Sequence, residues 1–190
     1  MATDGTPAAP PAEEEVAWLA RIARGDESAL QRIFDKWKLP LLSFFYRALG
    51  SHADAEDLTL EVFVRLHRAA GDYSPTAKFS TYLFHIAQNL AHNEHRRRRR
   101  KPAQPAPPEI FDAIASGAAG EARRAAELEE VLQLALQRLP EKSRTALLLI
   151  QQQRMDYAAA AATLQMTENA LRVLVHRARQ LLKTEMEAQP

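Results

Sequence analysis

FSTYLFHIAQNLAHNEHRRRRRK, residues 79–101, is the stretch that reveals most about the fold of this 190-residue chain. Its large apolar residues return every three or four positions, which is the period of an α-helix with one buried face. The members of that face are Phe79, Leu83, Ile86 and Leu90. The opposite face is polar and aromatic, and it leads directly into six consecutive cations at residues 96–101. The stretch therefore predicts a helix that packs on one side and presents a cationic, aromatic surface on the other.

The polar face of this helix has the character of a surface for single-stranded DNA. Tyr82 and His85 offer stacking rings, and Asn89 adds a bidentate amide beside the cations. Unstacked bases are held by this combination of stacking, amide contacts and positive charge. Six adjacent cations also repel one another unless an anion compensates them, and nucleic acid is the simplest such anion. Two structural alternatives stay open. In one, Tyr82 is an ordinary residue at the rim of the core and Asn89 is a surface amide. In the other, the cations form a solvated helix end, where the helix dipole favours positive charge.

Three further helices are expected towards the N-terminus. Their apolar spacing places them at residues 13–24, 26–49 and 54–70. Asp26 is the expected N-cap of the second helix, and Pro40 is expected to kink it. A polar turn, GDYSPTAK at residues 71–78, follows the third. Residues 1–12 are rich in Pro and Ala and are expected to be a disordered tail.

Towards the C-terminus the composition changes abruptly at residues 102–120, where Pro, Ala, Gly and Ser form a linker. An apolar island within it is expected to dock transiently; its members are Ile110, Phe111 and Ile114. Four more helices are then predicted at residues 121–138, 141–153, 157–164 and 168–186. No alternating strand pattern occurs. We therefore expect an all-α chain of two small helical domains, residues 13–101 and 121–190, whose relative placement in solution varies.

The last two predicted helices have the layout of a helix-turn-helix, whose second helix lies in the major groove of DNA. The turn between them is Gln165, Met166 and Thr167. The inward positions of the second helix are Leu171, Leu174, Val175, Ala178 and Leu182. Its outward positions are Asn169, Arg172, Val173, His176, Arg177 and Arg179. Helical hairpins are common, so a purely structural pair of helices is the alternative.

The third predicted helix carries DAEDLTLEVF, residues 54–63, and shows two faces. The core stripe consists of Leu58, Val62, Phe63 and Leu66. The second face interleaves carboxylates with apolar residues and consists of Asp57, Leu60, Glu61 and Val64. Exposed apolar side chains among carboxylates suit a basic partner helix. A solvated acidic first turn, stabilised by the helix dipole, explains Asp54 and Asp57 equally well, but it does not explain Leu60 and Val64.

Composition excludes several classes of protein. The chain has no Cys, so it is neither a disulfide scaffold nor a thiolate zinc protein, and its net charge is +1. No glycine-rich loop, GxSxG or HExxH motif occurs, so we expect neither an enzyme nor a cofactor. His92 and His95 lie three apart, but with one nearby carboxylate we interpret them as solvated histidines rather than metal ligands. No stretch suits a signal peptide or a membrane helix, and we expect a cytoplasmic protein without membrane insertion.

Together these stretches resemble the extracytoplasmic-function (ECF, group IV) sigma factors of bacterial RNA polymerase. The resemblance covers residues 26–101 and 127–183. The stretches that carry it are DAEDLTLEVFVRLHR, FSTYLFHIAQNLAHNEHRRRRR, LPEKSRTALLLI and DYAAAAATLQMTENALRVLVHRAR. It implies that the first domain is sigma region 2, the second is sigma region 4, and the linker threads through the polymerase toward its RNA exit path.

The resemblance also implies three sets of binding residues. Those for docking on core RNA polymerase are Asp54, Asp57, Leu60, Glu61 and Val64. Those for the melted minus-ten element of promoter DNA are Tyr73, Lys78, Phe79, Tyr82, His85, Asn89, His92, Arg96 and Arg97. Those for the duplex minus-thirty-five element are Thr167, Asn169, Arg172, Val173, His176, Arg177 and Arg179. An anti-sigma factor is implied as a further partner and, since no domain follows Pro190, as the means of control.

Some positions depart from the family pattern. Leu60 replaces a usual Gln, Tyr82 a usual Trp, Gln88 a usual Arg, Ala159 and Ala160 an acidic pair, and Gln165 a turn Gly. We expect Gln165 either near the left-handed region or in a different cap geometry. Val173 and Leu174 replace commonly polar or basic residues, so the promoter sequence cannot be inherited from the family. Thr59 is a possible site of modification, although a structural role is the commoner one for a helical Thr.

Two rival functions stay open on the sequence alone. A free-standing helix-turn-helix regulator binds duplex DNA as a dimer, but it leaves the Leu60 and Val64 face unexplained. A mimic of a sigma factor titrates an anti-sigma factor without directing transcription.

Overall fold

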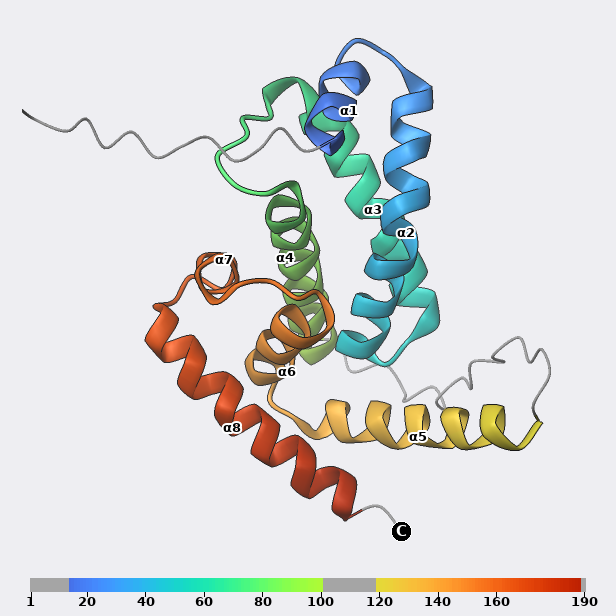
Figure 1. Cartoon of the computed structure of the whole chain (residues 1–190), viewed down its shortest axis with the longest axis vertical. Helices are drawn as coiled ribbons and strands as arrows, with labels where there is room; N and C mark the ends of the chain where they lie inside the picture. The colour runs from blue at the N-terminus through green and yellow to red at the C-terminus, as the bar shows by residue number, and fades with distance from the viewer. Residues whose placement is uncertain (1–13, 101–118, 189–190) are drawn as a thin grey trace, which may run out of the picture.

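The computed structural model describes residues 14–100 and 119–188, and for residues 119–122 it describes the backbone only. Within these ranges the regular structure is entirely helical, as expected (Figure 1). The elements are α1 (Glu14–Ile22), α2 (Glu27–Leu49), α3 (His52–Ala69), the 3₁₀ turn η1 (Ala70–Asp72), α4 (Phe79–Arg100), α5 (Ala119–Arg138), α6 (Glu141–Leu147), the π-helical turn η2 (Leu148–Gln152), α7 (Tyr157–Thr163) and α8 (Glu168–Glu187). The predictions for residues 1–12, Lys101 and the apolar island of the linker lie outside the described residues.

The first lobe consists of α1 to α4, and capping residues fix the ends of its longest helix. The Asp26 carboxylate accepts hydrogen bonds from the backbone N–H groups of Ser28 (3.0 Å) and Ala29 (3.3 Å), which confirms it as the N-cap of α2. Hydrogen bonds from Ser28 and then Arg21 lower the pKa of Asp26 to about 2. At the other end, Gly50 adopts φ 72°, a left-handed conformation that glycine reaches without strain. Pro40 lies inside α2 and does not end it.

Aromatic side chains fill the core of this lobe. The largest fully buried ones are Phe44, Phe45, Phe79 and Phe84. The ring centroids of Phe44 and Phe84 lie 5.5 Å apart, edge to face, and Trp37 lies 5.8 Å from Phe79. The predicted core face of α4 is confirmed for Phe79, Leu83 and Leu90, whereas Ile86 is only half-buried.

The second lobe consists of α5 to α8, with α7, a tight turn and α8 forming the helix-turn-helix. Gln165 adopts φ 52°, so the left-handed conformation is the one of its two expected geometries that occurs. Thr167 is the N-cap of α8, and its Oγ1 accepts a hydrogen bond from the Ala170 N–H at 3.2 Å. Asp156 caps α7 in the same way, from the Ala159 N–H at 2.8 Å. These caps fix where each helix of the motif begins.

The two lobes pack against each other. One continuous cluster of buried apolar side chains runs from Leu19 in α1 through Phe84 in α4 to Val175 in α8. Figure 1 shows α5 passing beneath the C-terminal end of α2, with α6 and α7 beside α4. In this structure the second lobe therefore packs against the first in a defined position. No helix in the described ranges is long and apolar enough to cross a membrane.

Candidate nucleic-acid interface

The outer face of α3 exposes apolar side chains among acids, as the sequence predicts. Leu60 is 55% exposed and Val64 is 41% exposed. Asp57 is exposed beside them, and the carboxylate of Glu61 accepts a hydrogen bond from Arg65 Nε at 2.7 Å. Because apolar side chains of this size are usually buried, their exposure on a regular helix marks a surface suited to a partner. Thr59, in contrast, is 3% exposed, so a modifying enzyme has no access to it in this structure.

Asp54 begins the same helix but is occupied within the chain. Its carboxylate pairs with Arg98, through a short hydrogen bond, and with Arg97 at 3.8 Å. Desolvation raises the pKa of Asp54, but hydrogen bonds from Ser51 and Arg98 outweigh it and hold that pKa below its usual value. The structure therefore gives Asp54 a role in joining α3 to α4.

The polar face of α4 forms part of a small hollow. The rings of Tyr73 and Tyr82 lie 4.9 Å apart, and burial raises the pKa of Tyr82. The hollow has a volume of about 170 Å³ and is lined by both tyrosines and His85, with Ala162 and Thr163 of α7 opposite. Two aromatic rings and an imidazole around one cavity can hold a planar base by stacking. Asn89 is half-buried further along the helix.

Two other predicted minus-ten residues have partners in the second lobe. Lys78 Nζ lies 3.8 Å from the carboxylate of Asp156, and His92 Nδ1 lies 2.7 Å from Glu141 Oε1. Phe79 is fully buried in the core beside Trp37, so it positions α4 and is not available to contact DNA.

The arginine run is compensated within the chain to an extent that the sequence analysis did not anticipate. Glu94 is buried between Arg97 (2.6 Å) and Arg98 (3.1 Å), and Arg99 lies 3.0 Å from Glu141. Arg97, Arg98 and Arg99 therefore have anionic partners within the chain, contrary to the expectation that this run needs an external anion. The i, i+3 and i, i+4 spacing from Glu94 was the signal available in the sequence. Among residues 96–100, Arg96 and Arg100 are exposed and make no ion pair.

His92 and His95 of α4 are not joined by the further ligands that a metal site needs. No group of three or more His, Asp or Glu side chains in the described ranges is arranged to hold a metal ion. His95 is largely desolvated, and this lowers its pKa below the usual value.

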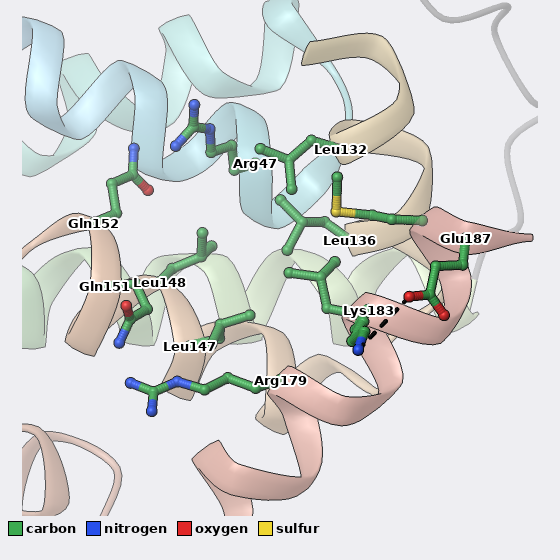
Figure 2. Close-up of a pocket in the computed structure, with 12 residues that line it drawn as sticks. Arg47, Leu132, Leu136, Leu147, Leu148, Gln151, Gln152, Arg179, Lys183 and Glu187 are labelled. Atoms are coloured by element: carbon green, nitrogen blue, oxygen red, sulfur yellow. Dashed lines mark ion pairs between the residues drawn. The ribbon is translucent and has the colours of Figure 1, made fainter. Parts of the chain in front are cut away.

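The outer face of α8 presents its predicted residues to solvent. The exposed members are Asn169, Arg172, Val173, His176, Arg177 and Arg179. Arg179 differs from the others because it also lines a hollow between α5, α6 and α8 (Figure 2). The inner face of α8 packs as predicted, with Leu171, Val175 and Ala178 buried and Leu174 and Leu182 partly so. Val173 is 44% exposed, which leaves an apolar contact on a face that is otherwise polar. Such a face can meet a thymine methyl group as well as base edges and phosphates.

Tyr157 is a residue that the sequence analysis missed. The guanidinium of Arg172 lies 4.3 Å from the centroid of the Tyr157 ring and donates a hydrogen bond to Glu168 at 3.3 Å. Tyr157 therefore orients the arginine from α7, and Glu168 orients it from α8. Spacing within α8 does not reveal the contact with Tyr157, because that residue belongs to α7.

Comparison with known proteins connects both lobes to one family. Residues 33–101 match the family model of Sigma-70 region 2, and residues 129–182 match that of Sigma-70 region 4. The ECF RNA polymerase sigma factor SigE of Mycolicibacterium smegmatis is 30% identical over 178 residues, which are 91% of this chain and 68% of that protein. This chain belongs to the ECF sigma factors. The ECF RNA polymerase sigma factor SigW of Bacillus subtilis is 27% identical over 176 residues, covering 88% of this chain and 94% of SigW.

A solved structure supports the fold independently. It is the sigma factor RpoE in complex with the anti-sigma factor NepR from Bartonella quintana, with a TM-score of 0.65 and 19% identity over 84% of this chain and 99% of RpoE. As an ECF sigma factor, the chain is a transcription initiation factor that directs core RNA polymerase to promoters. None of the comparisons favours a free-standing regulator.

Proposed function

We propose that this sigma factor divides its work among three surfaces. The outer face of α3 docks on core RNA polymerase, the polar face of α4 captures the melted minus-ten element, and the outer face of α8 reads the minus-thirty-five element. The first domain would span residues 13–101 and the second residues 121–190. The chain itself would catalyse no reaction and would act in the cytoplasm, where the polymerase performs the chemistry.

The exposed pair Leu60 and Val64, with Asp57 beside it, is the observation that carries the docking proposal. The few hot-spot residues at the centre of an interface each contribute about 2 kcal/mol or more, and charges around them select the partner. A basic, partly apolar helix of the polymerase suits this surface. Glu61, held by Arg65 in the free chain, would exchange that pair for a cation of the partner.

Substitutions on this face test the proposal. Leu60→Lys and Asp57→Lys should each weaken the affinity for core polymerase by about tenfold or more, since each replaces a matched contact with a repelled cation. Leu128→Lys is the matched control, because Leu128 is a leucine of similar exposure (59%) on α5 of the other lobe. Equal affinities for all three variants, with helical content unchanged, would contradict docking through α3.

For the minus-ten element, we propose that a flipped base enters the hollow between Tyr73, Tyr82 and His85. Stacking contributes about 1–3 kcal/mol per base, which offsets a similar cost of unstacking. Tyr82→Ala should therefore reduce promoter opening, measured by permanganate reactivity of unpaired thymines, while Tyr82→Phe retains it. Equal opening by both variants would contradict base capture at this site.

For the minus-thirty-five element, we propose that Arg172 and Arg177 contact guanine or phosphate and that Asn169 contacts an adenine edge. Thr167, Val173, His176 and Arg179 would complete this surface. Arg172→Ala should lower transcription mainly from promoters with an intact upstream element. A uniform loss on promoters with and without that element would contradict base recognition by Arg172.

We also propose an anti-sigma factor as a partner of this chain. Support comes from the related RpoE, whose structure was solved in complex with the anti-sigma factor NepR. An anti-sigma factor of this chain should compete with core polymerase for the face of α3. The competition should be lost in Leu60→Lys and kept in Leu128→Lys, as measured by displacement of a fluorescently labelled sigma factor from the polymerase.

A further inference from the structure

The backbone is left-handed at four residues of the described ranges, and each of them comes shortly after a helix. In the first lobe they are Gly25 (φ 88°), after α1, and Gly50 (φ 72°), after α2. In the second lobe they are Arg154 (φ 52°), after η2, and Gln165 (φ 52°), after α7. Glycine is the usual residue in this conformation because a β-carbon makes it costly. The two exceptions lie on either side of α7, the first helix of the helix-turn-helix.

Both turns in the second lobe are closed by hydrogen bonds between backbone groups. The pairs are Gln165 N to Ala162 O (3.2 Å), Met166 N to Ala161 O (3.0 Å) and Met155 N to Leu149 O (3.1 Å). The first two are the bonds of a Schellman motif, whose left-handed position is most often glycine. Because only the backbone takes part, a glycine at either position would form the same turn with less strain. The turns themselves therefore give no reason for an arginine and a glutamine.

The two side chains are available to a partner outside the chain. Arg154 and Gln165 are exposed, and neither side chain forms an ion pair or a hydrogen bond within the part of the chain that the structure describes. Asp156 is the carboxylate closest to Arg154 along the chain, but it is occupied elsewhere. It accepts a hydrogen bond from the Ala159 N–H at 2.8 Å and lies 3.8 Å from Lys78 Nζ. The charge of Arg154 is therefore left for an external anion.

Both positions adjoin the face of α8 that is proposed to read the minus-thirty-five element. Tyr157, three residues after Arg154, holds its ring 4.3 Å from the guanidinium of Arg172. Gln165 comes two residues before Thr167, the N-cap of α8. In a bound helix-turn-helix the N-terminal residues of the second helix contact base edges, while the first helix crosses the sugar-phosphate backbone. The two left-handed residues therefore belong to the part of the motif that meets the DNA backbone.

We infer that Arg154 and Gln165 contact DNA phosphates at the two ends of α7 and thereby position the helix-turn-helix on the duplex. This inference rests on the proposed reading of the minus-thirty-five element by α8. Arg154 supplies a charged contact, and Gln165 supplies a neutral amide donor. Phosphate contacts fix the register of a protein on duplex DNA without carrying sequence information. Binding to the backbone explains why side chains stand at two turns that glycine would form with less strain.

Substitution by glycine should change stability and DNA binding in opposite directions. Arg154→Gly and Gln165→Gly each remove a β-carbon from a left-handed residue, so each should raise the Tm of the full chain by about 2–4 °C. The polymerase holoenzyme formed with each variant is then titrated with a promoter fragment that the parent holoenzyme selects from a pool of upstream DNA. Its affinity should fall about threefold to tenfold for Arg154→Gly and about twofold for Gln165→Gly. A residue with only a structural role would not improve folding while it impairs binding.

The salt dependence of binding separates the charged contact from the neutral one. Each phosphate that a cation neutralises adds about one to the slope of log affinity against log salt concentration. Arg154→Gly should therefore lower this slope by about one, whereas Gln165→Gly and the charge-conserving Arg154→Lys should keep the slope of the parent. Arg24→Gly is the matched control, because Arg24 is an exposed arginine at a turn of the first lobe, and its slope should equal that of the parent.

Several results would overturn the inference. An unchanged slope for Arg154→Gly, or an equal loss of slope for Arg24→Gly, overturns the charged contact, and parental affinity for Gln165→Gly overturns the amide contact. A Tm that falls together with the affinity shows a structural effect and overturns both. Arg172→Ala separates this inference from the proposed function. If Arg172→Ala weakens binding and Arg154→Gly does not, only the inference fails, whereas if neither weakens binding, the proposed role of α8 fails with it.

Discussion

Replacing Arg144 with methionine removes the charged centre of the joint between the lobes while keeping a side chain of similar length. The change deletes the hydrogen bonds to Ala48 O (2.6 Å), Leu139 O (3.3 Å) and the side-chain oxygen of Gln137. Ala48 is itself buried, so water does not readily replace the lost donor. We expect the free energy of unfolding to fall and the second lobe to lose its fixed position on the first.

The magnitude follows from these three hydrogen bonds and from the burial of the arginine. A hydrogen bond from a charged donor contributes about 1.5–3 kcal/mol, and the longer bond to Leu139 contributes the smaller share. Against this, methionine escapes the desolvation cost of a buried guanidinium. The net loss should be about 2–4 kcal/mol, which corresponds to a fall in Tm of about 4–16 °C for a chain of this size.

Thermal unfolding followed by circular dichroism measures this loss. Arg138→Met is the matched control, because Arg138 is exposed and pairs with Glu185 at 3.0 Å on the surface. Exposed ion pairs contribute about 0–1 kcal/mol, so the control should unfold close to the parent. Equal, small losses for both variants would refute the reasoning that Arg144 holds the joint.

Three further predictions concern α7, α8 and the joint between the lobes. Tyr157→Leu should weaken recognition of the minus-thirty-five element several-fold while Tyr157→Phe retains it, because a cation–π contact such as that of Arg172 with this ring contributes about 0.5–1 kcal/mol at an exposed site. The affinity for duplex promoter DNA measures the effect, and equal affinities of both variants would contradict it. Thr167→Ala should lower the free energy of unfolding by about 1 kcal/mol and Thr167→Ser much less, since only the alanine lacks the oxygen that caps α8; urea unfolding is the assay, and an unaffected alanine variant would exclude the cap as a source of stability. Desolvation lowers the pKa of His95, so the unfolded chain binds a proton at this residue more readily than the folded chain, and stability should fall as the pH drops below about 6.5. His95→Gln should reduce this loss of stability, as measured by Tm between pH 7.5 and 6. An identical pH dependence of Tm in the variant would show that other groups cause the loss.

The sequence predicts what depends on neighbours along the chain. Asp26 as an N-cap and the exposed Leu60 were accessible from local pattern, because helix ends and amphipathic faces are set within a few residues. For Gln165 the sequence left two geometries open, and the structure has the left-handed one. The family resemblance supplied the order of the surfaces, and the comparisons confirm the family.

Contacts between distant segments were beyond that reasoning. Glu141 lies more than forty residues from His92 and Arg99, yet it compensates both of them, and Arg144 caps a helix that ends nearly a hundred residues earlier. A run of arginines therefore indicates a need for anions without showing whether DNA or the chain itself supplies them. The position of the second lobe on the first also depends on contacts between residues far apart in the sequence, and only the structure reveals it.

Transcription with purified core RNA polymerase shows whether this chain acts as a sigma factor. The chain is added to a core enzyme shown to be competent, and transcripts are mapped from a pool of upstream DNA fragments of the source organism. We expect new starts that share two short elements and that disappear with Leu60→Lys. Binding of DNA by the chain alone, with no new starts from the competent core, would contradict it.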